Sequence, residues 1–283
     1  MQCIIVAFAS LRHWNRDATL QLTTNKSIDK VYEKQLNHLD VSIKIVSYLH
    51  NPPMEFGDTF RGCFYLFDAM IAEEGSALFI DPDVYCVGPV SFDQLQKNVI
   101  GALNLNFHDD KIINGISPLD ARNIYTELTK LMMPKPHSHY GGEAIYIPRE
   151  IRNELLQDIE VLWIKNIEAA KKGNPFLTTE EHVISLVLAN YQVQNLKDII
   201  LRIWTSIKYT KVEGGILDVN RTMLWHLPAE KSYGFHTAYK LLQRGKLFEA
   251  KKRTFNRTSD ATIFHLNYSR YKKILNRFFS LLG

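Results

Sequence analysis

The chain has 283 residues, of which 46% are hydrophobic and 23% charged, and its formal net charge is +4. This ordinary globular composition excludes an intrinsically disordered or fibrous protein, and no stretch reaches the ~18–20 apolar residues of a transmembrane helix. The charge is uneven, because residues 251–283 carry eight basic groups and one acidic group, which leaves residues 1–250 at −3. A body of that sign lacks the distributed cationic face of a nucleic-acid-binding protein.

The predicted elements of the N-terminal part alternate between strand and helix. Residues 2–9 (QCIIVAFA) form a short apolar run, which predicts a buried parallel strand ending at Ser10. A polar stretch to about Ser27 follows, and then a helical pattern through Val31, Leu36 and Leu39. Residues 41–47 alternate between apolar and polar side chains and predict a second strand.

The rest of the chain continues this alternation. It predicts helices over residues 59–74, 151–170 and 178–190 and strands over residues 77–80, 99–106 and 144–147. A Thr-Thr-Glu-Glu capping sequence begins the last helix. The order predicts an α/β fold with a mostly parallel sheet flanked by helices. We expect one catalytic-type domain over residues 1–245 and a basic C-terminal appendage over residues 246–283.

The strongest chemical feature is Asp81-Pro82-Asp83, which directly follows the apolar strand at residues 77–80. In open parallel sheets, ligands bind at the carboxyl ends of the strands. Two carboxylates separated by one residue suit a hard divalent cation whose other ligands are phosphate oxygens. An Asp-Pro turn with solvated acids is the alternative interpretation, and the preceding strand and helix favour the metal site.

Residues 59–90 resemble the core of nucleotide-sugar glycosyltransferases with the Rossmann-like GT-A fold. In that family an Asp-x-Asp motif holds Mn²⁺ or Mg²⁺ against the diphosphate of the donor. The resemblance implies that Asp83 binds the metal, that Asp81 contacts the donor and the metal, and that Arg61 meets the donor. It also implies donor contacts at the end of the first strand, from Ala7, Phe8 and Ser10.

Residues 139–147 (HYGGEAIYI) are similar to a Tyr-Gly-Gly-Ala stretch of the retaining glycosyltransferase families six and eight. The resemblance implies donor contacts at Gly141 and Gly142, since paired glycines let the backbone approach a ligand closely. A simple turn before a strand is equally consistent with these two glycines.

Residues 174–182 resemble a His-Asp-Glu-Ser-His stretch of family six, in which a glutamate lies under the anomeric carbon of the donor. Aligning the histidines places Glu180 at that catalytic position, and Glu181, one residue further, is the second candidate. Thr179 and Glu181 depart from the family pattern. The alternative is a helix start at which two acids interact favourably with the helix dipole.

Residues 224–234 resemble the closing segment of family eight, in which a histidine completes the metal shell and a lysine meets the diphosphate. The resemblance implies that His226 is the third metal ligand and that Lys231 contacts the donor. Ser232 and Tyr233 stand where that family has Pro-Trp. His265 competes with His226 for the role of ligand.

The polar residues Asn104, His108 and Asp109 follow the strand at residues 99–106, in a region that faces the acceptor in GT-A enzymes. They also fit an ordinary polar loop. The resemblance therefore predicts a metal-dependent hexosyltransferase that uses Mn²⁺ or Mg²⁺ and a nucleotide sugar, by default UDP-linked. The acceptor would be a glycan or a lipid-linked saccharide, and the similarity over residues 139–182 favours retention of configuration.

Three other functions stay open at this point. The first is an inverting glycosyltransferase. The second is a sugar nucleotidyltransferase, although residues 7–16 lack the glycine-rich loop that usually opens such enzymes. The third is a noncatalytic carbohydrate-binding protein.

The location is predicted from the cysteines and the basic tail. Three widely spaced cysteines indicate a reducing compartment. Residues 246–283 combine basic and aromatic side chains in a pattern typical of an amphipathic helix that binds an anionic membrane surface. Docking of this helix on the body or on a partner is the alternative. We expect a cytoplasmic protein that binds the inner face of the membrane peripherally and does not bind nucleic acid.

Overall fold

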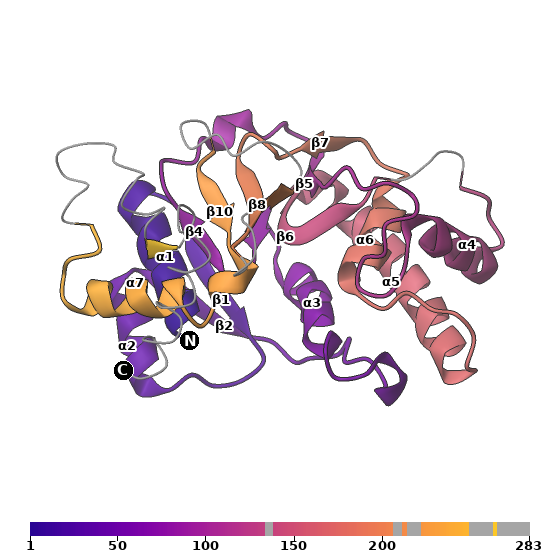
Figure 1. Ribbon diagram of the computed structural model, residues 1–283, viewed down its shortest axis with the longest axis horizontal. Coiled ribbons are helices and arrows are strands. Elements are labelled where there is room, and N and C mark those ends of the chain that lie inside the picture. Colours follow the sequence, from indigo (N-terminus) through magenta and orange to yellow (C-terminus); the bar gives the residue numbers. More distant parts are fainter. Residues whose placement is uncertain (134–137, 206–210, 214–221, 249–262, 265–283) are drawn as a thin grey trace.

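The computed structural model describes residues 1–133, 138–205, 211–213, 222–248 and 263–264 (Figure 1). Its helices are α1 (Gln2–Trp14), α2 (Lys30–His38), α3 (Tyr65–Ala72), α4 (Pro118–Thr129), α5 (Arg149–Lys171), α6 (Glu180–Leu188) and α7 (Gly234–Gln243). Its strands are β1 (Leu20–Thr24), β2 (Val41–Ile45), β3 (Ala77–Ile80), β4 (Val84–Cys86), β5 (Ile100–Asn104), β6 (Tyr140–Ile147), β7 (Val193–Asn195), β8 (Ile200–Trp204), β9 (Lys211–Glu213) and β10 (Leu224–His226). Short 3₁₀ turns lie at Met54–Phe56, Arg61–Phe64, Phe92–Gln94 and Pro228–Glu230.

The described strands form three sheets, with the orders β1-β2, β3-β6-β5-β7 and β4-β10-β8-β9. Three of the pairs (β1 with β2, β5 with β7, and β8 with β10) are parallel, and the other four are antiparallel. The fold is mixed α/β, with parallel strands flanked by helices, and is compatible with a Rossmann-like fold. The prediction of a mostly parallel sheet is wrong for the described residues. Side-chain patterns carry no strand direction, and the three-residue strands β4, β7, β9 and β10 are too short to show a pattern.

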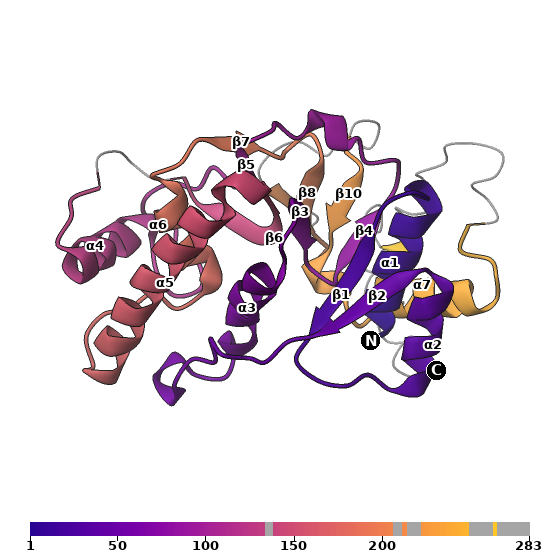
Figure 2. The same ribbon diagram turned by 180° about the vertical axis from the view of Figure 1, so that it is seen from behind.

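Helices α1, α2 and α7 lie at one end of the molecule and α4, α5 and α6 at the other, with α3 between them (Figures 1 and 2). At one end α1 packs on α7, α2 and β4, and at the other end α6 packs on α5, α4 and β6. Each group has its own core. One core surrounds Trp163, Phe64 and Phe67, and the other surrounds Tyr85 and Trp225. Strands β4 and β10, which adjoin the polar site described below, contribute Tyr85 and Trp225 to the second core.

Residues 2–9, predicted as a strand, belong to helix α1. A short apolar run does not distinguish a buried strand from a buried helix, and this helix is apolar on most sides because α7, α2 and β4 cover it. The hydroxyl of Ser10 donates to Ala7 O at 2.8 Å and accepts the Cys86 N–H at 3.0 Å. The prediction that Ala7, Phe8 and Ser10 lie at the end of a strand is therefore wrong. Their assignment as donor contacts depended on that strand end and is no longer supported by it.

The polar stretch that follows contains β1, which was not predicted. Leu20 and Leu22 alternate with Gln21 and Thr23, a strand pattern hidden by the polar composition. The helix and strand predicted next are confirmed as α2 and β2. Asp29 is the N-cap of helix α2, and its side chain accepts the Val31 N–H at 2.8 Å.

Most predicted elements of the central part are confirmed. The helices predicted over residues 59–74, 151–170 and 178–190 correspond to α3, α5 and α6, and the strands over 77–80, 99–106 and 144–147 correspond to β3, β5 and β6. Helix α4 was missed, although Ser117-Pro118 is a typical helix start. The Ser117 hydroxyl accepts the Asp120 N–H at 3.1 Å.

The predicted C-terminal appendage lies outside the described residues, apart from positions 246–248 and 263–264. Within these, Leu247 and Phe264 are buried in the same core as Phe235. The start of the predicted appendage therefore contributes to the packing of the body. Among the helices that the structure describes, none combines the length and apolarity needed to cross a membrane.

Candidate functional site

The Asp81-Pro82-Asp83 segment is the turn at which the chain passes from one sheet to another. Strand β3 ends at Ile80 in the β3-β6-β5-β7 sheet, and β4 begins at Val84 in the β4-β10-β8-β9 sheet. The backbone of the turn is fixed on both sides, because the Asp81 N–H donates to Glu143 O at 3.0 Å and the Val84 N–H to Asp81 O at 3.2 Å. Both carboxylates are thus held where the two sheets meet.

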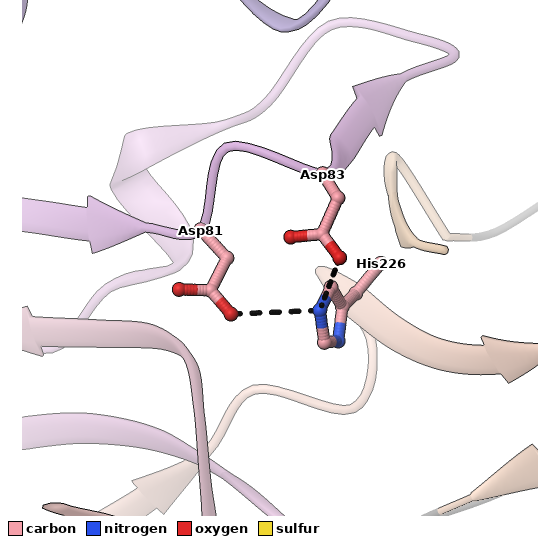
Figure 3. A group of neighbouring side chains, drawn as sticks. All are labelled: Asp81, Asp83 and His226. Atoms are coloured by element: carbon pink, nitrogen blue, oxygen red, sulfur yellow. Dashed lines mark ion pairs between the residues drawn. The ribbon is translucent and has the colours of Figure 1, made fainter. Parts of the chain in front are cut away.

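His226 completes a three-residue cluster with these aspartates. It lies on β10, opposite Val84 of β4 in the antiparallel register. Its Nε2 is 3.5 Å from Asp81 Oδ2 and 3.3 Å from Asp83 Oδ2, and Figure 3 shows both carboxylates pointing toward the ring. The side chains of Asp83 and His226 are 0% and 7% exposed, but that of Asp81 is 45% exposed. Solvent and a ligand therefore reach the cluster from the Asp81 side.

The cluster has the chemistry of a divalent-metal site. One oxygen or nitrogen atom from each residue lies within 4.8 Å of the others. Both carboxylate oxygens of Asp83 are buried. Oδ2 forms ion pairs with His226 and Lys231, whereas Oδ1 has no partner among the described residues. A buried carboxylate oxygen without a partner is costly, and a metal ion would compensate it. Two carboxylates and an imidazole suit Mn²⁺ and related ions, so the residues predicted as metal ligands are brought together in a fitting arrangement.

The charges around the cluster match this interpretation. Burial alone would lower the pKa of His226, but the carboxylates of Asp83 and Glu143 raise it to about 10. Burial would raise the pKa of Asp83, but the neighbouring His226 and Lys231, whose Nζ lies 3.1 Å from Asp83 Oδ2, lower it. The free site therefore holds an imidazolium, and a metal that binds His226 has to displace its proton.

A buried ion network extends from this cluster along β6 and β8. Arg202 on β8 binds Glu143 on β6 through two contacts, Nε to Oε1 at 3.0 Å and Nη2 to Oε2 at 2.5 Å. The same guanidinium also pairs with Glu181 at the start of α6. Glu143 Oε1 lies 3.8 Å from His226 Nδ1. The metal cluster and the start of α6 thus belong to one continuous set of charges.

Glu180 and Glu181, the two predicted catalytic residues, lie in different environments. Glu181 is buried, accepts the Gly142 N–H at 3.0 Å and lies 3.3 Å from His139 Nε2. Burial would raise the pKa of Glu181, but the charge of Arg202 and the contacts with His139 and Gly142 lower it. Glu180 is partly exposed, and burial together with the adjacent Glu181 charge raises its pKa to about 8. Glu181 is therefore held as an anion by the fold, while Glu180 is the less buried of the two and lies against Gly142.

Gly141 and Gly142 both lie against the protein's own carboxyl groups. A Cβ at Gly141 would lie 1.9 Å from Glu143 Oε2, and a Cβ at Gly142 would lie 2.7 Å from Glu180 Oε1. The two glycines let β6 pass between the acidic side chains. This packing explains them without a donor contact.

The start of α6 lacks the side-chain capping hydrogen bond that the Thr-Thr-Glu-Glu sequence predicts. Thr179 is the N-cap residue, but its side chain makes no capping hydrogen bond and lies 3.0 Å from His182 Nδ1 instead. His182 is buried, with Nε2 3.1 Å from Ile113 O. The negative charge of Glu181 in the first turn of this helix is compensated by its ion pair with Arg202, in addition to the helix dipole.

The predicted donor contact Lys231 lies next to a surface pocket. The pocket has a volume of about 550 Å³ and is lined by Met1, Gln2, Cys3, Tyr32, Lys231, Ser232 and His236. It adjoins the metal cluster, because the Cys3 thiol donates to Pro82 O at 3.0 Å and Lys231 pairs with Asp83.

Arg61, the other predicted donor contact, is held by local contacts. Its Nη2 lies 3.3 Å from Asn51 Oδ1 and 3.2 Å from Pro52 O.

The predicted acceptor residues do not join the cluster. Asn104 binds the Ser138 hydroxyl at 2.9 Å, His108 is exposed, and Asp109 forms a two-contact ion pair with Arg122 at 2.8 and 2.6 Å. Their contacts are those of a polar loop. His265, the alternative metal ligand, lies outside the described residues.

Three residues of the site were missed from the sequence: Glu143, Arg202 and His139. Arg202 lies in the apolar strand Ile-Leu-Arg-Ile-Trp, and a lone arginine at a buried strand position signals a buried acidic partner. Glu143 and His139 lie on either side of the two glycines in a segment already recognised as a motif.

No family model matches this chain, and a search of curated proteins finds no match.

Proposed function

We propose that this chain is a metal-dependent glycosyltransferase of the GT-A type that transfers a hexose from a nucleotide sugar. The observation that carries the proposal is the Asp81–Asp83–His226 cluster between two sheets, with Lys231 and Glu180 beside it. A divalent ion bound there would neutralise the negative charge that develops on a leaving diphosphate.

The residues around the cluster have separable roles in this proposal. Lys231 adds a second positive charge, and the pocket that it lines gives room for the anionic part of the donor. Glu180, which is partly exposed and interacts with Asp81, supplies a carboxyl group for the sugar or the incoming hydroxyl group. Arg202 and Glu181 hold the Gly141-Gly142 segment in place between these groups.

Retention of configuration is the stereochemical outcome that Glu180 favours. A carboxylate that lies close to the sugar carbon can trap or stabilise the cationic sugar, as in retaining glycosidases. The raised pKa of Glu180 means that it is protonated at neutral pH in the free protein. A cationic sugar at this position would favour its ionised form.

The first prediction tests the chemistry and the ligand set together. We expect the wild type to release nucleoside diphosphate from one member of a panel of nucleotide sugars, UDP-hexoses first, only when Mn²⁺ or Mg²⁺ is present. Asp83→Ala should reduce that rate at least ~10³-fold, because it removes the fully buried ligand. Asp158→Ala is the matched control, since Asp158 lies on α5 outside the cluster and accepts a hydrogen bond from the Tyr191 hydroxyl.

The product distinguishes the competing chemistries. Release of pyrophosphate from a nucleoside triphosphate and a sugar phosphate would instead identify a nucleotidyltransferase. Absence of turnover and of metal-dependent donor binding in calorimetry would contradict the proposal. A saccharide or lipid-linked acceptor and a position at the cytoplasmic face of the membrane remain part of the proposal, tested by transfer to lipid-linked saccharides in vesicles.

A further inference from the structure

One residue, Glu143, touches two of the three candidate metal ligands in different ways. Its backbone carbonyl accepts the Asp81 N–H at 3.0 Å. Its side-chain Oε1 faces Nδ1 of His226 at 3.8 Å, on the ring edge opposite the two aspartates. Glu143 is completely buried on β6, and β6 pairs with β3, the strand that ends at Asp81. The position of this residue thus determines where both ligands lie.

The two nitrogens of His226 face different partners. Nε2 points at Asp81 and Asp83, so it is the nitrogen available to a metal. Nδ1 is buried and has no hydrogen-bond partner among the described residues, and Glu143 Oε1 is the carboxylate oxygen placed beside it. A histidine that binds metal through one nitrogen commonly has its other N–H oriented by a carboxylate, which fixes the tautomer and the ring angle.

Arg202 in turn fixes Glu143. It holds both carboxylate oxygens of Glu143, and it lies beside His226 in the parallel register of β8 and β10. A carboxylate offers about four acceptor positions, so Oε1 can accept from Arg202 Nε and from His226 Nδ1 together. A displacement of β6, β8 or β10 relative to the other two strands would therefore move His226 away from Glu143.

We infer that Glu143 is the positioning residue of the metal centre, orienting His226 through Nδ1 and Asp81 through its backbone, with Arg202 holding it in place. This inference rests on the metal binding proposed above. It does not depend on which reaction follows, because it concerns the protein and the ion alone.

The test measures Mn²⁺ affinity by calorimetry and by the electron paramagnetic resonance signal of free Mn²⁺, without any sugar nucleotide. We expect Glu143→Gln to weaken Mn²⁺ binding by about 10–100-fold. Glu213→Gln is the matched control, since Glu213 also pairs with cations but makes no contact with His226. The control should bind Mn²⁺ within a factor of two of the wild type.

A double-mutant cycle separates positioning from general damage to the fold. If Glu143 acts through His226, Glu143→Gln added to His226→Ala should weaken binding by less than twofold beyond His226→Ala alone. An unchanged Mn²⁺ affinity in Glu143→Gln would overturn the inference, and so would a full 10–100-fold loss in the His226→Ala background. A wild type that binds no Mn²⁺ would remove the metal site and the proposed function together.

If Glu143→Gln does not fold, the wild type still decides the question. With diamagnetic Cd²⁺ bound, long-range proton–nitrogen spectra of the imidazole should show a protonated Nδ1 and a metal-bound Nε2 for His226. Binding of Cd²⁺ through Nδ1 would refute the orientation.

Discussion

Gly141 shows how closely single atoms are packed in this site. Its missing side chain leaves the space that Glu143 Oε2 and Arg202 Nη2 occupy, and an added Cβ would lie 1.9 and 2.7 Å from them. We expect Gly141→Ala to lower the free energy of unfolding by about 1–3 kcal/mol through overpacking and to weaken Mn²⁺ binding as Glu143 shifts. Urea denaturation and Mn²⁺ titration measure both effects.

The matched control is Gly62→Ala, since a Cβ at Gly62 meets nothing within 4 Å. This control should leave stability unchanged or raise it by up to about 1 kcal/mol. Equal stability of the two alanine variants would contradict the packing argument.

Glu180 makes the stability of the protein depend on pH. Burial and the adjacent Glu181 charge raise its pKa to about 8 from an ordinary value near 4.5. The folded state therefore keeps a proton that the unfolded state loses, so the contribution of this group to stability is present at low pH and is lost between about pH 4.5 and pH 8. Glu180→Gln removes this loss, and its unfolding free energy relative to the wild type should rise with pH across that window. A difference that stays constant from pH 5 to pH 8 would show that the pKa is not raised.

At the scale of elements, the sequence predicted α2, α5 and α6 and the strands β2, β3 and β5 because their apolar spacing is regular. It failed where a run of residues is apolar in every direction or where a strand is very short. Residues 2–9 satisfy both the strand and the buried-helix pattern, and only the packing of α1 against α7 and β4 decides between them.

The same division holds for the candidate site. Asp81 and Asp83 could be named from a local motif, because they follow the recognisable strand β3. His226 was named only through the resemblance of residues 224–234, because its strand β10 is too short to show a pattern. Glu143 and Arg202 could not be paired, since 59 residues separate them and they lie on strands of different sheets, β6 and β8. Their contact exists only when the two sheets are brought together. A buried charge in an apolar strand indicates that a partner exists but does not identify it.

At the scale of the whole molecule, the two cores differ in how far they reach along the chain. The core around Tyr85 and Phe235 includes Phe264, whose side chain is fully buried and whose ring centroid lies 4.7 Å from that of Tyr85. We expect Phe264→Ala to lower the free energy of unfolding by about 3–5 kcal/mol, as measured by chemical denaturation.

Phe92→Ala, at a side chain that is 51% exposed, should change stability by less than about 0.5 kcal/mol. If Phe264→Ala behaved like this control, Phe264 would contribute nothing to the stability of the body. The expected result includes Phe264 in the folded unit, so membrane-binding tests should truncate the chain beyond that residue.

The turn at Asp81–Asp83 has one more consequence for the chain. Asp81 follows a strand of one sheet, whereas Asp83 precedes and His226 lies on strands of the other. Neither sheet alone carries the complete ligand set, so the affinity for the ion depends on how the two sheets are placed relative to each other. A change that shifts one sheet against the other can abolish metal binding while both sheets stay folded. Loss of activity is therefore not by itself evidence of unfolding.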